Sequence, residues 1–233
     1  MVIPRKINFT QLERYGKRCE QCYRQTFTKE FDWIRYNMEL MNTLFGRNDR
    51  KAIAIDPSYI SKSGKHTPWI GYFWSGCAGQ AKRGLEILGV GAIDIDKRDC
   101  VMLKAEQTPD TITLDNVGCT LIDWYLKVLE RIKDRLLEVS NYVVADAYFS
   151  KATFATGLDY MGFHLVSRFR DDANLMYIHD GQPTGKRGRP KVHGDKIDFK
   201  HLDYTKIQEI ETNNEDGKLY TLIAYSQIGR ASC

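Results

Sequence analysis

Apolar residues recur at every third or fourth position over three stretches of the chain, a spacing that lines one side of a helix. Over residues 9–46 this spacing predicts two or three helices. From Ile112 to Val139 an unbroken apolar stripe predicts one long amphipathic helix. Residues 150–161 predict a shorter helix that ends near Gly162, because glycine commonly follows a helix C-terminus.

Short apolar runs rich in β-branched residues lie between these helices and predict strands. The strands expected in the main domain are residues 51–56, 83–96, 100–107, 141–145 and 163–169. The tight link Lys97-Arg98-Asp99 makes the second and third an antiparallel hairpin. Residues 204–212 and 218–226 predict strands of a smaller β-rich section. The order strand, strand, strand, helix, strand, helix, strand is typical of an α/β fold.

The composition is that of a globular chain, because 42% of its 233 residues are hydrophobic and 27% are charged. No apolar stretch of about 18 residues and no signal-peptide pattern occurs, so we expect a cytoplasmic protein without a membrane segment. The net charge of +4 is too small to indicate an acidic partner by itself. An interaction with nucleic acid must therefore rest on local clusters of basic residues.

Two aspartates each stand at the end of a predicted strand. Asp56 closes the run KAIAID before a loop of Gly, Ser, Pro and Lys, and Asp146 follows NYVVA. A right-handed helical crossover commonly joins neighbouring parallel strands, so both carboxylates meet at the sheet edge where ligands gather. They repel each other unless a cation lies between them, and Mg²⁺ or Mn²⁺ suits oxygen ligands. The alternative is structural: Asp56 caps the following turn, and Asp146 caps a helix beginning near Ser150.

Three runs of sequence together resemble the catalytic domain of insertion-sequence transposases of the DDE class. They are AIDPSYISKSGKHTP, FWSGCAGQAKRGLEILGVGAIDID, and VVADAYFSKATF followed by HLVSRFRDDANL. The resemblance covers about residues 5–228 and implies a ribonuclease-H-like α/β fold, a mixed sheet flanked by helices. We expect a helical N-terminal segment over 1–48, the catalytic core over 50–175 and a partial β-rich insertion over 176–233.

The resemblance also implies a chemistry for the two aspartates. Asp56 and Asp146 are then the first two acids of a metal-binding triad that holds Mg²⁺ or Mn²⁺. In a two-metal site one ion activates the attacking oxygen and the other stabilises the leaving oxygen at phosphorus. The expected partner is double-stranded DNA, both element ends and target, cut and joined by strand cleavage and transfer. A homodimer on the DNA fits this function.

Basic residues in two places suit contacts to DNA. By the resemblance, the residues placed near phosphates beside the aspartates are Lys62, Lys65 and Arg168. A second cluster lies in the loop GKRGRPK, whose Gly and Pro content predicts exposure. Its basic residues are Lys186, Arg187, Arg189 and Lys191. Such a cluster is either a solvated loop or an arm that follows phosphates or the minor groove, and we favour the arm.

Four aromatic residues follow the first predicted strand: Trp69, Tyr72, Phe73 and Trp74. Aromatic rings stack on unpaired bases, so these residues are candidates to hold bases splayed from DNA ends. Aromatic residues beside a sheet are more often packed into the core or its rim. We therefore favour packing for this group.

The third acid of the resembled family is a glutamate on a helix after the β-rich insertion, and we expect this chain to lack it. Glu209, Glu211 and Glu215 lie in KIQEIETNNEDGK, which predicts strand and turn rather than helix. The sequence thus favours a truncated transposase copy that does not cut DNA by itself. Two alternatives stay open: a non-catalytic remnant that binds element ends, and a small metal-dependent nuclease that recruits one of these glutamates.

Overall fold

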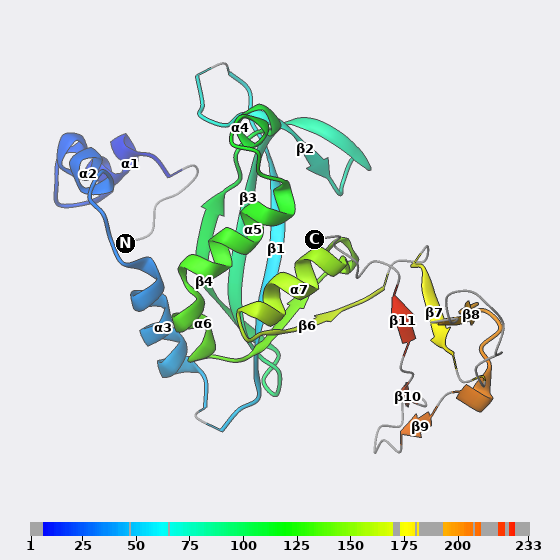
Figure 1. Ribbon diagram of the computed structural model, residues 1–233. Coiled ribbons are helices and arrows are strands. Elements are labelled where there is room, and N and C mark those ends of the chain that lie inside the picture. Colours follow the sequence, from blue (N-terminus) through cyan, green and yellow to red (C-terminus); the bar gives the residue numbers. More distant parts are fainter. Residues whose placement is uncertain are drawn as a thin grey trace.

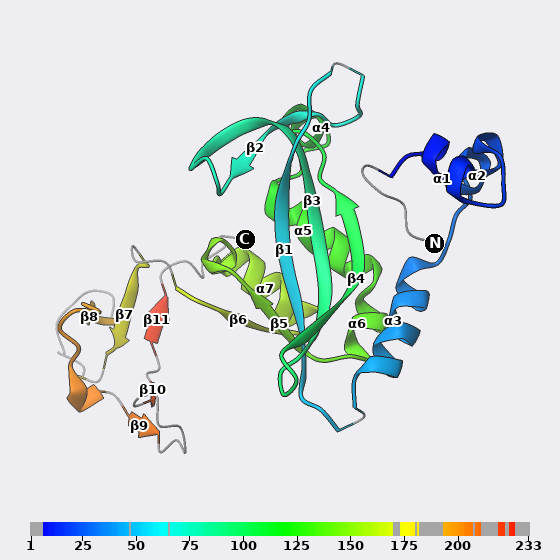
Figure 2. The same ribbon diagram turned by 180° about the vertical axis from the view of Figure 1, so that it is seen from behind.

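Three helices precede a central sheet in the computed structural model, shown from two opposite sides in Figures 1 and 2. The structure describes residues 7–46, 48–64, 66–169, 173–179, 181, 193–206, 208–210, 219–221 and 224–226. The helices are α1 (Phe9–Tyr15), α2 (Glu20–Phe27) and α3 (Trp33–Leu44). The prediction of two or three N-terminal helices is therefore confirmed.

Helix α3 joins this segment to the sheet. Each of the three N-terminal helices begins where a side chain accepts a backbone hydrogen bond. For α3 that side chain is Asp32. Met38 and Met41 are buried on the side of α3 that contacts β4 (Asp99–Gln107). Asn37 Nδ2 donates a 3.2 Å hydrogen bond to the Leu103 carbonyl oxygen, which fixes the helix along that strand.

The central sheet is mixed, as predicted for an α/β fold. Its strands are β1 (Lys51–Ser61), β2 (Gly71–Ser75), β3 (Gln80–Asp94), β4, β5 (Tyr142–Ala145) and β6 (His164–Ser167). They lie in the order β2-β3-β1-β5-β6, with β4 also paired to β3. The pairs among the first four strands are antiparallel, whereas β1 with β5 and β5 with β6 are parallel.

The long strand β3 pairs with three other strands of the sheet, β1, β2 and β4. It forms the predicted hairpin with β4, and the ladder shifts register between Val90 and Gly91. A Cβ at Gly91 would lie 2.9 Å from Cys100 Sγ, so a larger residue there would force the Cys100 side chain to move. The other end of β3 pairs with β2, a five-residue strand that the sequence pattern did not predict.

The first strand is longer than predicted, which corrects the placement of Asp56. We expected a strand to end at Asp56, but β1 continues through Asp56 and Pro57 to Ser61. The antiparallel pairing with β3 runs along the whole strand. The pairing with β5 covers only Ile53 and Ala54, so β1 has an open side at Pro57, where the missing N–H is tolerated.

The single long helix predicted from Ile112 to Val139 is wrong. The structure has α4 (Thr111–Asn116), α5 (Leu121–Arg131) and α6 (Lys133–Leu137) in its place. Gly118 takes a left-handed φ of 60° after α4, and Thr120 starts α5 through a reciprocal capping box with Asp123. Helices α5 and α6 bury residues in the same core, whereas the buried residue of α4, Leu114, lies outside that cluster.

One hydrophobic core lies between the sheet and the helices of one face. Helices α5 and α7 (Ala152–Tyr160) lie in front of the sheet in Figure 1 and behind it in Figure 2. The predicted helix end near Gly162 is confirmed, with a left-handed φ of 86° at that residue. The largest fully buried side chains of this core include Tyr125, Phe149, Phe154, Ile53, Leu88 and Leu129.

Small sheets follow β6 and lie apart from the central sheet in both ribbon views. One has the order β11-β7-β8, and the other pairs β9 with β10. Their strands are β7 (Leu175–Ile178), β8 (His193–Lys196), β9 (Gln208–Ile210), β10 (Leu219–Thr221) and β11 (Ala224–Ser226). Strands β9 to β11 fall within the runs predicted as β-rich, whereas β7 and β8 were not predicted. In the part of the chain that the structure describes, every helix is too short or too polar to cross a bilayer.

Candidate metal and DNA site

Asp56 and Asp146 come to the same level of the sheet from two neighbouring parallel strands. The register pairs Ile53 with Val143 and Ala54 with Val144. Continued by two places, it sets Asp56 beside Asp146, immediately after β5 ends at Ala145. The structure thus brings the two predicted acids together, although Asp56 lies within a strand rather than at its end.

The two carboxylates affect each other electrostatically. Partial burial raises the pKa of Asp56 above its ordinary value, and the negative charge of Asp146 raises it further. A hydrogen bond from the Ser58 hydroxyl lowers this pKa and opposes the first two effects. The protein environment therefore disfavours the ionised form of Asp56, and a cation bound between the two acids would stabilise that form.

Asp146 is held in place by the turn that follows it. Its Oδ1 accepts a 3.0 Å hydrogen bond from the Tyr148 backbone N–H at the start of the 3₁₀ turn η1 (Ala147–Phe149). Its carbonyl oxygen accepts a 2.7 Å hydrogen bond from Ser167 Oγ at the end of β6. The predicted capping role is thus confirmed for η1 and not for α7, whose N-cap residue, Lys151, makes no side-chain cap.

Both aspartates line a cavity of about 640 Å³. The cavity runs from the carboxylates to β2, α4 and the start of α5. Its other lining residues are Pro57, Tyr72, Phe73, Trp74, Glu86, Thr111, Leu114, Asp115, Cys119, Thr120, Leu121, Tyr125 and Tyr148. The volume lies within the range of pockets that bind small organic ligands.

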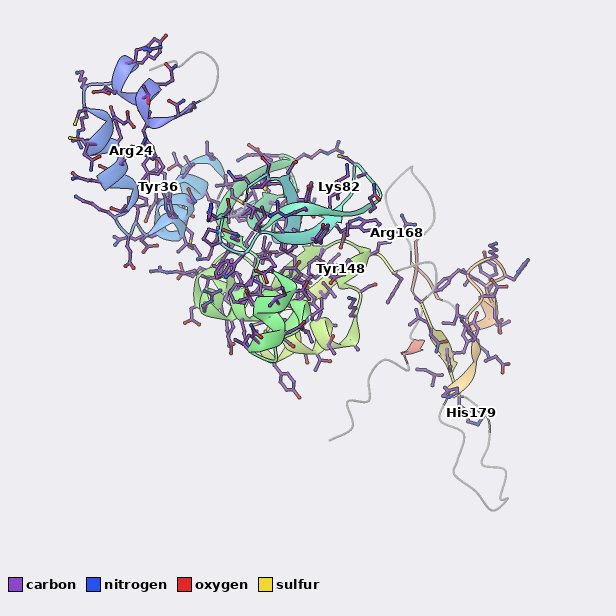
Figure 3. All side chains as sticks on the ribbon, turned by 90° about the horizontal axis from the view of Figure 1, so that it is seen from above. Arg24, Tyr36, Lys82, Tyr148, Arg168 and His179 are labelled. Atoms are coloured by element: carbon purple, nitrogen blue, oxygen red, sulfur yellow. The ribbon has the colours of Figure 1, made fainter. Side chains whose placement is uncertain are left out.

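A buried carboxylate and two tyrosines form one wall of this cavity. Glu86 is only 6% exposed, and its Oε1 accepts a 2.6 Å hydrogen bond from the Tyr125 hydroxyl. Burial raises the pKa of Tyr125, and so does the charge of Glu86, so the phenol stays protonated as the donor. Burial also raises the pKa of Tyr148, with smaller effects from the charges of Glu86 and Asp146. The hydroxyl of Tyr148, labelled in Figure 3, is therefore influenced by the negative charges of both Glu86 and Asp146.

Sequence reasoning missed Glu86, Tyr125 and Tyr148 as residues of the site. The one signal for Glu86 is its position in β3, where it takes the same side of the strand as the buried residues Leu88 and Val90. A charged residue in the buried phase of an alternating strand indicates a paired or functional group. Nothing in the sequence pattern distinguishes Tyr125 from the other core residues of α5.

The donor atoms at Asp56 and Asp146 fit Mg²⁺ or Mn²⁺, which bind carboxylate oxygens. The mutual repulsion that raises the pKa of Asp56 is the electrostatic condition that a divalent cation neutralises. Within the described part of the chain, no group of three or more His, Cys, Asp or Glu side chains comes together to hold a metal. The described residues therefore offer two aspartates, Asp56 and Asp146, as metal ligands.

Two of the predicted DNA-contacting residues can be placed in the structure. Lys62 is exposed in the segment that follows β1. Arg168 is exposed where β6 leaves the central sheet, next to the Ser167 that contacts the Asp146 backbone (Figure 3). The other predicted contacts, Lys65, Lys186, Arg187, Arg189 and Lys191, lie outside the described residues.

The late glutamates lie in the β-rich section. Glu209 is in β9, which confirms the strand predicted for it and places it on no helix. Glu211 and Glu215 lie outside the residues that the structure describes. A third acid on a helix, the feature that the resemblance associates with the metal site, is thus not found at Glu209.

A mixed sheet with helices against one face and paired acids on adjacent parallel strands defines an α/β protein of the ribonuclease-H-like kind. The comparison with protein families identifies the group within that class. The family model described as DDE superfamily endonuclease matches residues 14–222, so the chain belongs to this family. No curated protein matches the chain. Enzymes of the DDE superfamily generally use divalent metal ions, and endonucleases of this kind act on DNA.

Proposed function

We propose that the chain is the catalytic domain of an insertion-sequence transposase, in which Asp56 and Asp146 hold Mg²⁺ or Mn²⁺ for strand cleavage and transfer on DNA. One observation carries the proposal: two carboxylates reach the same level of adjacent parallel strands in a DDE-family chain. The raised pKa of Asp56 supports it, because the pair is electrostatically suited to a cation.

Each part of the site has a task in this chemistry. Asp56 and Asp146 would supply the oxygen ligands, and the bound cation would stabilise negative charge on the scissile phosphate. Lys62, in the segment after β1, and Arg168, at the end of β6, are both exposed and suit contacts to DNA phosphates. We extend the same role to Lys65 and to the basic cluster of residues 186–191.

A non-catalytic DNA-binding role is the second candidate function, and one observation favours it. Among the described residues no third carboxylate joins Asp56 and Asp146. Two ligands leave a pair of metal ions loosely held, and a reacting group misplaced by about 1 Å can lose on the order of 10²-fold in rate. We propose that cleavage by this site requires a further acid, and that the pair alone binds a cation weakly.

The proposed function is tested by a reaction that needs a bound cation but no catalysis. Fe²⁺ replaces Mg²⁺ at oxygen-rich sites, and with ascorbate and peroxide it produces hydroxyl radicals that cut nearby DNA strands. We expect the protein with Fe²⁺ to cut bound duplex DNA at localised positions. These cuts should disappear in Asp56→Asn and Asp146→Asn and persist in Asp159→Asn, an exposed carboxylate on α7 away from the site.

The gel readout separates the possibilities cleanly. Localised cuts that persist unchanged in both site variants would contradict the assignment of the cation to these two residues. Retained duplex binding by the variants, measured on a native gel, shows that lost cutting reflects a lost cation and not lost DNA.

A further inference from the structure

The structure divides the four aromatic residues after β1 into two pairs. Phe73 is buried at 7% exposure, and Trp69 is 39% exposed but packs edge-on against Trp124 with ring centroids 6.4 Å apart. Tyr72 and Trp74 are instead 72% and 64% exposed. Packing therefore explains the first pair, as the sequence favoured, but it does not explain the second.

Tyr72 and Trp74 are presented by a paired strand rather than by an irregular loop. Both lie on the same face of β2, opposite Arg83 and Ala81 of β3. The base of this hairpin is fixed, because the Arg83 carbonyl oxygen accepts a 2.7 Å hydrogen bond from the Tyr59 hydroxyl. Rings held in this way lose little conformational entropy when a ligand stacks on them.

Both rings line the same cavity as the paired acids, and the composition of that cavity selects its ligand. Four of its lining residues are carboxylates: Asp56, Glu86, Asp115 and Asp146. None of the described residues that line it is Lys, Arg or His. Away from a bound cation a phosphate is therefore repelled from the interior, whereas a neutral, flat group with N–H donors is attracted by both the rings and the carboxylates.

Two basic residues of the same hairpin are exposed: Arg83 stands opposite Tyr72 and so shares the face of the two rings, whereas Lys82 takes the other face of β3. Figure 3 shows Lys82 on this part of the molecule. Arg83 also donates a 2.8 Å hydrogen bond from Nη2 to the Gly64 carbonyl oxygen, which leaves its other N–H groups for a phosphate. The hairpin thus places an exposed cation, Arg83, beside the two aromatic residues that line the cavity.

We propose that Tyr72 and Trp74 hold an unpaired nucleobase of the DNA strand in the cavity beside Asp56 and Asp146. The base stacks on the two rings, and the backbone passes Arg83 on the same face. The identity of the nucleic acid rests on the proposed function, whereas the choice of an unpaired base over a phosphate or a paired base rests on the cavity. The site adds a preference for DNA whose end is frayed or single-stranded.

The test compares two DNA probes in EDTA, so that it does not depend on metal or on cleavage. One probe is a blunt duplex, and the other is the same duplex with a short single-stranded tail containing 2-aminopurine. Tyr72→Ala/Trp74→Ala should weaken binding of the tailed probe about tenfold or more, since a stacked base contributes strongly to affinity. The 2-aminopurine quenching seen with the parent protein should disappear, and blunt-duplex affinity should stay unchanged.

Trp33→Ala/Tyr36→Ala is the matched control, because these rings are 63% and 55% exposed on α3 and do not line the cavity. It should bind both probes like the parent protein. Unchanged tail affinity in Tyr72→Ala/Trp74→Ala, or an equal loss for both probes, would overturn the proposal. Asp146→Asn keeps the two hypotheses apart, because it should lose the Fe²⁺-dependent cuts and yet keep the preference for the tailed probe in EDTA.

Discussion

Lys97 is a residue whose charge links the segment after α3 to the turn between β3 and β4. Its Nζ lies 2.8 Å from Asp49 Oδ2 and donates a 3.2 Å hydrogen bond to the Leu44 carbonyl oxygen. The hydrogen bond from Lys97, followed by one from the Gly46 backbone N–H, lowers the pKa of Asp49 to about 2. Lys97 and Asp49 are partly exposed, so their contact should have a modest effect that depends on pH and salt; Lys97 Nζ also lies 3.6 Å from Oδ2 of the fully buried Asp94.

Lys97→Met should therefore change the pH dependence of stability in a definite direction. A carboxyl group whose pKa is depressed on folding stabilises the protein above its unfolded pKa of about 4, and this stabilisation is lost as pH falls toward the folded pKa of about 2. The melting temperature of Lys97→Met should lie below that of the parent at pH 7, and the difference should shrink between pH about 4 and about 2. Lys29→Met, an exposed lysine at the end of α2, should melt like the parent. A difference that stays constant over this pH range would refute the role of the Asp49 charge.

At this scale the sequence predicted the two acids but not their neighbours. Asp56 and Asp146 are found because each follows an apolar run and each belongs to a recognisable motif. Glu86 contacts Tyr125 across 39 positions of sequence, a separation that no local pattern contains. The chemistry of the cavity wall is therefore visible only once β3 and α5 are packed together.

The breaks between α4, α5 and α6 are features of the elements themselves. Hydrophobic spacing predicted one helix, because apolar residues recur at helical intervals through all three helices, and those of α5 and α6 pack in one core. The sequence did contain stop and start signals, namely Gly118 and the Thr120–Asp123 capping box. The extension of β1 past Pro57 is the opposite case, in which pairing with β3 overrides a residue that disfavours strands.

Gly118→Ala tests whether this break is fixed by backbone conformation. A Cβ at Gly118 would meet nothing within 4 Å, so any cost comes from its left-handed φ of 60° and should be about 1 kcal/mol. Gly76 offers a matched control, because a Cβ there also meets nothing within 4 Å and its φ is not positive. Urea unfolding should show a lower midpoint for Gly118→Ala and an unchanged or slightly higher one for Gly76→Ala. Equal midpoints for the two variants would mean that the conformation at Gly118 does not set the break.

At the scale of the whole molecule, the order of strands and helices predicted the α/β fold and the adjacency of β1 and β5. The C-terminal sheets were less predictable, because their strands are three or four residues long and pair across wide gaps in sequence, as β7 does with β11. Such short strands contain too few positions for a period to be recognised. In the central sheet β1, β3 and β4 have nine or more residues, and the four-residue strands β5 and β6 lie within apolar runs that were predicted as strands.

The central claim, that Asp56 and Asp146 jointly bind a divalent cation, is tested most directly by titrating Mn²⁺ into the full chain while the free ion is measured by electron paramagnetic resonance. With two carboxylate ligands we expect one weak site with a Kd on the order of 1 mM, which corresponds to about −4 kcal/mol. Asp56→Asn and Asp146→Asn should each abolish this site, and Asp159→Asn should leave it unchanged. Binding as tight as that of the parent in either site variant would contradict the account.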